Sequence, residues 1–148
     1  MKKLSITTSV LVIAIAFLFT ACKKENQVAP IAISLGSPAN NAVISLEEAK
    51  QSVNFKWSVG PTSPMITYRL RVWQLMQGQN GTTAMRDSEP IVDKSTDVNT
   101  ITISGMLTGP CKPPYLCDFV WNVVIIERDS NGTMKETIVS STGSFSVN

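Results

Sequence analysis

Residues 53–58 read Val-Asn-Phe-Lys-Trp-Ser and alternate strictly between apolar and polar side chains. In an extended chain, successive side chains point to opposite faces. Val53, Phe55 and Trp57 therefore share one face, and the polar residues share the other. This stretch predicts a β-strand with one face buried in a core and the other in water.

The same period of two recurs along the chain after residue 30, where no segment keeps the apolar spacing of a long helix. One short exception is residues 45–50, where Ser45 is in place to cap a helical turn. Turn-forming residues separate the alternating runs at short intervals, which is typical of all-β domains. The expected strands are 31–35, 42–45, 53–58, 66–73, 101–104, 119–126 and 134–147, the last with a break near Gly143.

Two Asn-Gly pairs, Asn80-Gly81 and Asn131-Gly132, stand between apolar runs. Both residues of such a pair tolerate the positive φ of a tight turn, so each pair predicts a β-hairpin. Residues 37–41 also have the composition of a turn. Residues 129–133 begin like a calcium-binding loop, but the later ligands and the closing glutamate are missing. We interpret them as turn residues.

Several short motifs between residues 31 and 148 point to a known architecture. They are the Ser37-Pro38 opening, the 53–57 strand with its tryptophan, Tyr68-Leu70-Val72, Leu107, Phe119-Trp121-Val123 and Phe145-Val147. With these motifs the chain resembles the fibronectin type III and related immunoglobulin-like families. Where the family usually has a corner tyrosine, this chain has Phe119, so the corner bond is lost unless Tyr115 supplies it. The resemblance implies an all-β, immunoglobulin-like (fibronectin type III-like) two-sheet sandwich of about seven strands over residues 31–148.

The first residues have the three parts of a secretory signal: Lys2 and Lys3, a polar step, and an apolar run over residues 10–19. As a helix this run rises about 15 Å, half of a bilayer's hydrocarbon core, so it is too short to stay as a membrane span. Residues 18–22 read Leu-Phe-Thr-Ala-Cys and resemble the lipobox of bacterial lipoproteins. The alternative is an ordinary signal beside a chance cysteine. The resemblance implies a signal peptide at residues 1–21 and lipidation of Cys22.

The lipobox also implies where the protein resides. Acyl chains on Cys22, palmitate among them, bind membrane with about 0.8 kcal/mol for each buried methylene. The mature protein is then tethered to a membrane, and residues 22–30 are expected to form a flexible tether. In the family such proteins are exported and anchored to the bacterial outer membrane. Whether the domain faces the periplasm or the cell exterior stays open.

Cys111 and Cys117 enclose a short loop that contains two prolines. Outside the cytosol such a pair is oxidised more often than not, so we predict a disulfide. Closing a ring of this size contributes about 2 kcal/mol on the chain-entropy model. A redox-active pair would need the tighter Cys-x-x-Cys spacing, and a metal site would need further ligands.

The composition of the 148 residues, 43% hydrophobic and 16% charged, is that of a folded chain. There is no histidine, which removes the usual general base and the commonest metal ligand. Nucleophile elbows and glycine-rich phosphate loops are also missing. We expect no enzyme activity, no cofactor and no metal. Of 13 basic residues, Lys2 and Lys3 leave with the signal and the rest balance 11 acidic ones, so no nucleic-acid partner is expected.

The predicted strand at 119–126 is apolar on both faces, so its outer side chains need a cover. In a sandwich of this type it lies beside the strand at 66–73, whose outer row is cationic and aromatic. The two rows form a candidate binding face made of Arg69, Arg71, Trp73, Val120, Val124 and Ile126. Arginine and tryptophan favour protein contacts, and an aromatic plate suits a sugar ring. The alternative is that a neighbouring strand, the tether or a dimer partner shields these side chains.

These features are consistent with two hypotheses about function. The leading hypothesis is a lipid-anchored, exported binding or scaffolding module that acts on a protein partner through the candidate binding face. The second is a glycan-binding lipoprotein of a polysaccharide-capture system. The chain is similar to the leading immunoglobulin-like domain of the starch-utilisation outer-membrane lipoproteins, in its Phe55-x-Trp57 and Tyr68-x-Leu70 strand pair. Those proteins are much longer and hold their sugars in later domains.

Overall fold

The computed structural model describes residues 31–60, 66–107, 111–128 and 131–148. Ile31–Asn148 forms one compact unit. In the described residues of this unit, nine strands form two sheets, with two short helices in the connections. The predicted signal peptide (1–21), the tether (22–30) and Cys22 lie outside the described residues.

The smaller sheet consists of β1 (Ile33–Ser37), β3 (Ser52–Val59) and β6 (Thr100–Ser104), with β3 in the middle. Both pairs are antiparallel. Burial along β3 follows the sequence pattern, since Val53 and every second residue after it up to Trp57 are buried. The strand predicted from this alternation is confirmed.

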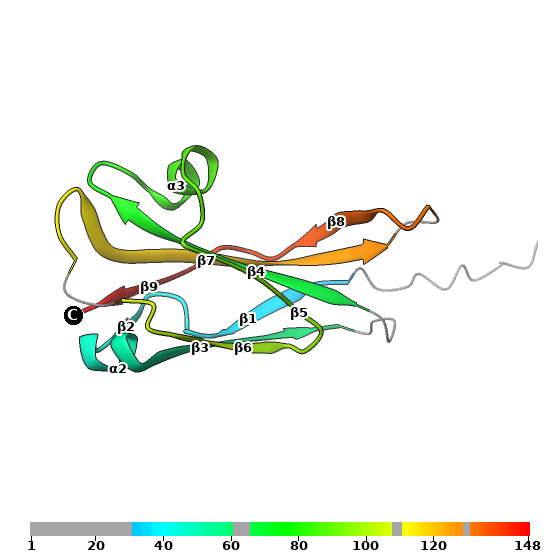
Figure 1. Ribbon diagram of the computed structural model, residues 1–148, viewed down its shortest axis with the longest axis horizontal. Helices are drawn as coiled ribbons and strands as arrows, with labels where there is room; N and C mark the ends of the chain where they lie inside the picture. The colour runs from blue at the N-terminus through cyan, green and yellow to red at the C-terminus, as the bar shows by residue number, and fades with distance from the viewer. Residues whose placement is uncertain (1–30, 61–65, 108–110, 129–130) are drawn as a thin grey trace, which may run out of the picture. The chain divides into compact units, whose positions relative to one another are not determined.

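The larger sheet has the order β2, β9, β7, β4, β5, and β8 also pairs with β7. Its neighbouring strands are antiparallel, apart from the parallel pair β2 and β9. Figure 1 shows the two sheets as two layers that face each other. The strands are β2 (Ala42–Ile44), β4 (Thr67–Met76), β5 (Val92–Thr96), β7 (Tyr115–Arg128), β8 (Met134–Val139) and β9 (Gly143–Val147).

β8 and β9 lie along the same edge of β7 and act as one interrupted strand. β9 pairs with β7 as far as Trp121, and β8 pairs with it from Val124 onward. Ser140 bridges the gap: its N–H donates to the Val123 carbonyl (2.8 Å), and its hydroxyl accepts from the Val123 N–H (3.0 Å). The predicted break near Gly143 is confirmed.

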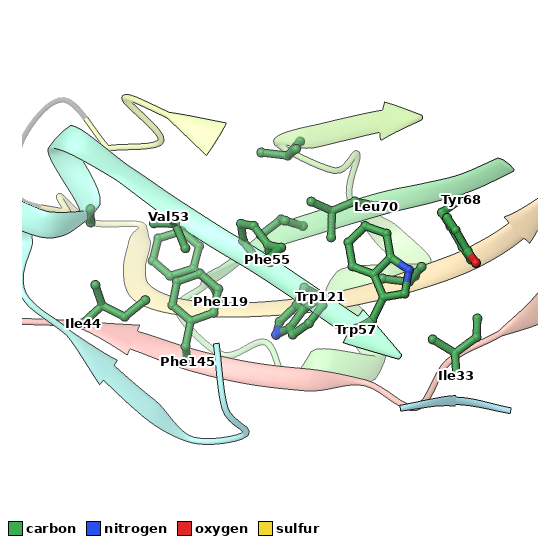
Figure 2. Packing of buried hydrophobic residues seen from close by; sticks show 14 of the residues in the cluster. Ile33, Ile44, Val53, Phe55, Trp57, Tyr68, Leu70, Phe119, Trp121 and Phe145 are labelled. Atoms are coloured by element: carbon green, nitrogen blue, oxygen red, sulfur yellow. The ribbon is translucent and has the colours of Figure 1, made fainter. Parts of the chain in front are cut away.

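The inner faces of the two sheets bury an aromatic core (Figure 2). The Phe55 ring of β3 meets the Trp121 ring of β7 edge-on, with centroids 5.2 Å apart. On the larger sheet, Phe119 stacks on Phe145 at 5.0 Å. Such pairs contribute about 1 kcal/mol each beyond the area they bury. The core therefore joins residues from both sheets and from distant parts of the sequence.

Gly143 at the start of β9 is required by this core. A Cβ atom added there would lie 2.5 Å from Trp121 Nε1 and 3.0 Å from Leu35 Cδ1. Trp121 is fully buried, so its ring cannot move out toward solvent. Glycine thus lets the indole pass directly over the β9 backbone.

The described residues contain nine strands, where about seven were predicted. One addition comes from the division of the last strand. The other is β5, in which Val92 is the single apolar residue among polar and charged ones. A period of two is not visible there, because β5 is held by its pairing with β4 from Val72 to Tyr68 and not by a buried row of its own.

Two local predictions are confirmed. The predicted helical turn is α2 (Leu46–Gln51), and the Oγ of its cap Ser45 accepts from the Glu48 N–H over 3.2 Å. At the second Asn-Gly pair, Asn131-Gly132, Gly132 has a φ of 80° and lies between the antiparallel strands β7 and β8. This is the predicted hairpin.

The hairpin predicted at Asn80-Gly81 is wrong, because these residues begin the helix α3 (Gly81–Asp87). The Asn80 side chain accepts from the Thr83 N–H (3.0 Å), and the Thr83 hydroxyl accepts from the Asn80 N–H (2.9 Å). Asparagine suits both a turn and a helix cap. Thr83, three residues later, completes a capping box and favours the helix.

Candidate binding face

β4 and β7 are neighbours in the larger sheet, and their outward side chains form its outer face. The register pairs Arg69 with Val124, and Trp73 with Val120. Residues directly opposite each other in an antiparallel pair lie on the same face. The structure thus brings together, on one face, Arg69, Arg71, Trp73, Val120, Val124 and Ile126.

α3 covers the aromatic end of this face (Figure 1). Ala84 of α3 packs with Trp73 and Val120, which are 4% and 5% exposed. Trp73 Nε1 donates to the carbonyl of Ser88, at the end of α3, over 3.1 Å. The sequence left open what shields these side chains. The shield is a helix in the β4–β5 connection, which sequence reasoning missed because it assigned Asn80-Gly81 to a hairpin.

Val124 and Ile126, at the other end of the face, are also buried. Arg69 on β4 donates from Nη1 to Glu136 Oε1 on β8 over 3.0 Å, and β7 lies between these two strands. The arginine side chain therefore crosses the outer face of β7. Its methylene groups shield the aliphatic residues below, and the charged head stays accessible.

Four side chains form a charged cluster on this face: Arg69, Arg71, Asp93 and Glu136. Asp93 on β5 accepts two hydrogen bonds of 2.6 Å from Arg69, through Nε and Nη2. Glu136 Oε1 accepts from both Arg69 and Arg71. The four side chains are between 22% and 37% exposed. The cluster thus links β5, β4 and β8 and remains open to water.

The two arginines of the charged cluster have different surroundings. The hydrogen bond between Arg69 and Asp93 raises the pKa of the guanidinium and lowers the pKa of the carboxyl. The pKa of Arg71 is lowered, first by burial and then by the positive charge of Arg69. In the part of the chain that the structure describes, Arg71 makes one side-chain hydrogen bond, to Glu136. Arg71 stays protonated, and it makes fewer hydrogen bonds to carboxylates than Arg69 does.

Asn122 on β7 lies between α3 and the charged cluster, opposite Arg71, and is 7% exposed. Its Nδ2 donates to Met85 Sδ of α3 at 3.8 Å. Its Oδ1 has no hydrogen-bond partner among the described residues. A buried amide oxygen without a partner costs about 1–3 kcal/mol. Within the described residues, the same holds for two buried N–H groups of the inner core, the indole N–H groups of Trp57 and Trp121.

The predicted disulfide between Cys111 and Cys117 is present, with the sulfurs 2.06 Å apart. The loop that it closes leads into β7. Gln74 on β4 donates from Nε2 to the Leu116 carbonyl over 2.8 Å, which ties this loop to the end of β4. A disulfide is typical of a location outside the cytosol.

A cleft of about 400 Å³ lies between β5 and β6. Its walls are residues 91–94 and 103–106. Across the described ranges, no three metal-ligating side chains come together. Within the same ranges, the helices are too short and too polar to cross a membrane.

A scan against protein-family models finds no match for this chain, and a search of the curated proteins finds no relative. The structure itself establishes a mainly-β domain of two sheets, with a disulfide-closed loop and a charged cluster on the outer face of the larger sheet.

Proposed function

We propose that this chain is an exported, lipid-anchored binding or scaffolding module that contacts a protein partner through the charged cluster, without catalysis. The observation that carries the proposal is Arg71. It is a cation held on a sheet face by one described hydrogen bond, beside a second arginine. Arg71 is also partly exposed, so an acidic group of a partner can add a further contact to it.

An immunoglobulin-like sandwich is proposed for the domain on the basis of its strand order. The order β1-β3-β6 in one sheet and β9-β7-β4-β5 in the other matches the immunoglobulin arrangement A-B-E and G-F-C-C′. The short strand β2, parallel to β9, is then a second segment of the first strand. In this arrangement the charged cluster lies on the sheet that immunoglobulin variable-type domains extend.

Export and lipid attachment are proposed from the signal at residues 1–21 and from Cys22. The Cys111–Cys117 disulfide supports a place outside the cytosol, where such bonds persist. The tether at 22–30 joins the lipid to the first described residue of the domain, Ile31. The membrane is then one partner, and the charged cluster is free to meet another.

The surface beside the charged cluster favours a protein partner. Val139 on β8 is 57% exposed and lies opposite Val124, in the same row of side chains as Arg69. Arginine is enriched among the residues that dominate protein contacts, and an exposed apolar side chain beside it adds area that a protein surface can bury. A partner carboxylate can take the place of Glu136 at Arg71. We therefore infer an acidic protein surface as the ligand.

The glycan alternative required an open aromatic plate, and Trp73 was the candidate. Trp73 is buried under α3, and none of the six residues of the candidate binding face presents an open ring. Sugar rings bind by stacking on such a ring together with hydrogen bonds. The described contacts of the face therefore favour the protein partner over the glycan.

The test is photo-crosslinking in bacterial cells that make the full chain. A photoreactive amino acid at Val139 probes the charged cluster, and one at the exposed Ser58 probes the outer face of the smaller sheet. We expect protein adducts at position 139 that fall at least tenfold with Arg71→Gln and are unchanged with Lys56→Gln. Equal adduct yields at both positions, or a yield at position 139 that does not change with Arg71→Gln, would contradict the proposal.

A further inference from the structure

β6 is one of the two edge strands of the smaller sheet, and within the described residues it pairs with β3 alone. It reads Thr-Ile-Thr-Ile-Ser over Thr100–Ser104, with no charge, no proline and no irregularity in its register. An edge of this composition accepts a further strand unless something blocks it.

The other open edges of the described sheets carry the usual protection. β5 has Asp93 and Lys94 on its edge, and β8 has Lys135 and Glu136. β2 is three residues long, and β1 has a register irregularity near its end. Charges, short length and bulges all discourage the addition of another strand. β6 lacks each of these devices.

The backbone of β6 is oriented for such an addition. The Asn99 carbonyl accepts from Trp57 N–H (3.1 Å), and Gly105 N–H donates to the Gln51 carbonyl (3.3 Å). Both residues therefore direct their main-chain groups to the β3 side. Because this direction alternates along an antiparallel strand, the main-chain groups of Thr100, Thr102 and Ser104 point to the open edge.

We propose that two copies of this chain associate through β6, paired antiparallel about Thr102, so that their smaller sheets become one continuous sheet. In this register Thr102 lies opposite its own copy and Thr100 lies opposite Ser104. Small hydroxyl side chains then meet, and about six main-chain hydrogen bonds form. The same symmetric pairing of β5 places either Asp93 or Lys94 against itself, which like charges disfavour.

The cleft between β5 and β6 adds an apolar contact to this interface. Ile103 and Met106 line the cleft, and so does Ile91, which is 46% exposed. Side chains of an added strand alternate between the two faces of the sheet. Ile101 and Ile103 of the second copy therefore lie on the same side of the joined sheet as the cleft, next to its apolar wall.

The first test is a disulfide crosslink in the full chain, solubilised in mild detergent and treated with a mild chemical oxidant. In the proposed register the two Thr102 Cα atoms are about 5.5 Å apart, within the reach of a disulfide. We expect Thr102→Cys to give covalent dimers on a non-reducing gel, at least tenfold more than Ser58→Cys. Ser58 is exposed on the same sheet face, but on the inner strand β3.

The second test keeps the proposal open to refutation if the added cysteine disturbs the fold. Analytical ultracentrifugation of the full chain is expected to show a dimer whose dissociation constant rises at least tenfold with Thr102→Lys and is unchanged with Ser58→Lys. A monomeric wild-type chain overturns the proposal, as does equal crosslinking of the two cysteine variants. A binding partner found at Val139 does not bear on this result, so the outcome is separate from the proposed function.

Discussion

The two faces of the larger sheet each bury a tryptophan, but by different means. Trp121 on the inner face is fully buried against Phe55 of the other sheet. Trp73 on the outer face is covered by the seven-residue helix α3, which belongs to the next connection along the chain. The inner cover comes from distant segments, and the outer cover is local.

Because of this difference, we expect the inner cover to be lost only when the whole domain unfolds, and the outer cover to be lost in a local opening. A contact between distant segments exists only when the whole domain is folded, whereas a short helix on a sheet face can open by itself. The inner face therefore holds the two sheets together. We expect that the outer face can lose the α3 cover, or exchange its charged partners, with a smaller loss in the free energy of unfolding.

The largest expected effect is the loss of either tryptophan. We expect Trp121→Ala to lower the free energy of unfolding by about 5 kcal/mol and Trp73→Ala by about 3 kcal/mol, because α3 can settle into the space that Trp73 leaves. Urea unfolding measures both, with Thr82→Ala on the exposed side of α3 as the control. Equal losses at the two sites would show that the outer cover is as rigid as the inner core.

A second substitution tests how closely the inner face is packed. Gly143→Ala places a Cβ atom 2.5 Å from Trp121 Nε1, so we expect it to lower the free energy of unfolding by about 3 kcal/mol. Gly60→Ala is the matched control, since nothing lies within 4 Å of its Cβ position, and it is expected to change stability by less than about 0.5 kcal/mol. A Gly143→Ala protein as stable as the control contradicts the packing described for Trp121.

Removal of the α3 cap tests the outer face alone. Asn80→Ala deletes the side-chain bond to Thr83 N–H, which is expected to cost about 1 kcal/mol. In hydrogen exchange, the amides of α3 are expected to lose protection while those of β7 keep theirs. Asn99→Ala, at an exposed turn, is the control. Loss of protection in β7 as well would mean that α3 does not open independently.

The smallest expected effect lies in the charged cluster. The pKa of the Asp93 carboxyl is lowered by Arg69, so Asp93 stabilises the fold above its unfolded-state pKa and loses this contribution as pH falls through its folded-state pKa. The group is partly exposed, so Asp93→Asn is expected to cost about 0.5 kcal/mol at neutral pH and nothing in acid. Thermal unfolding over a pH series measures the difference, which should also shrink in high salt.

Much of the inner architecture could be predicted because apolar and polar residues alternate along the strands that line the core. The strand around Phe55 has one face in the core and the other in water, as do other strands around it. This arrangement gives the sequence of each such strand a period of two. The cap of α2 at Ser45 and the disulfide could also be predicted, because each depends on residues close in sequence.

The outer face could not be predicted to the same depth. Asn80-Gly81 suits a hairpin and a helix cap alike, and the choice of the helix decided whether Trp73 is open or buried. β5 has one apolar residue and is defined by its pairing with β4. Arg69 and Arg71 could be placed on the outer face, but their carboxylate partners lie on other strands. Contacts between distant residues of this kind leave no local pattern.

The function proposed for the charged cluster depends on the proposed export and lipid attachment, and metabolic labelling tests the lipid attachment most directly. Bacteria that make the full chain are grown with an alkyne-tagged palmitate, and the protein is isolated and examined for the tag. We expect the label on the wild-type chain and none on a Cys22→Ser variant. A wild-type chain without label, or a Cys22→Ser chain labelled to the same extent, would contradict the lipid anchor and the location that follows from it.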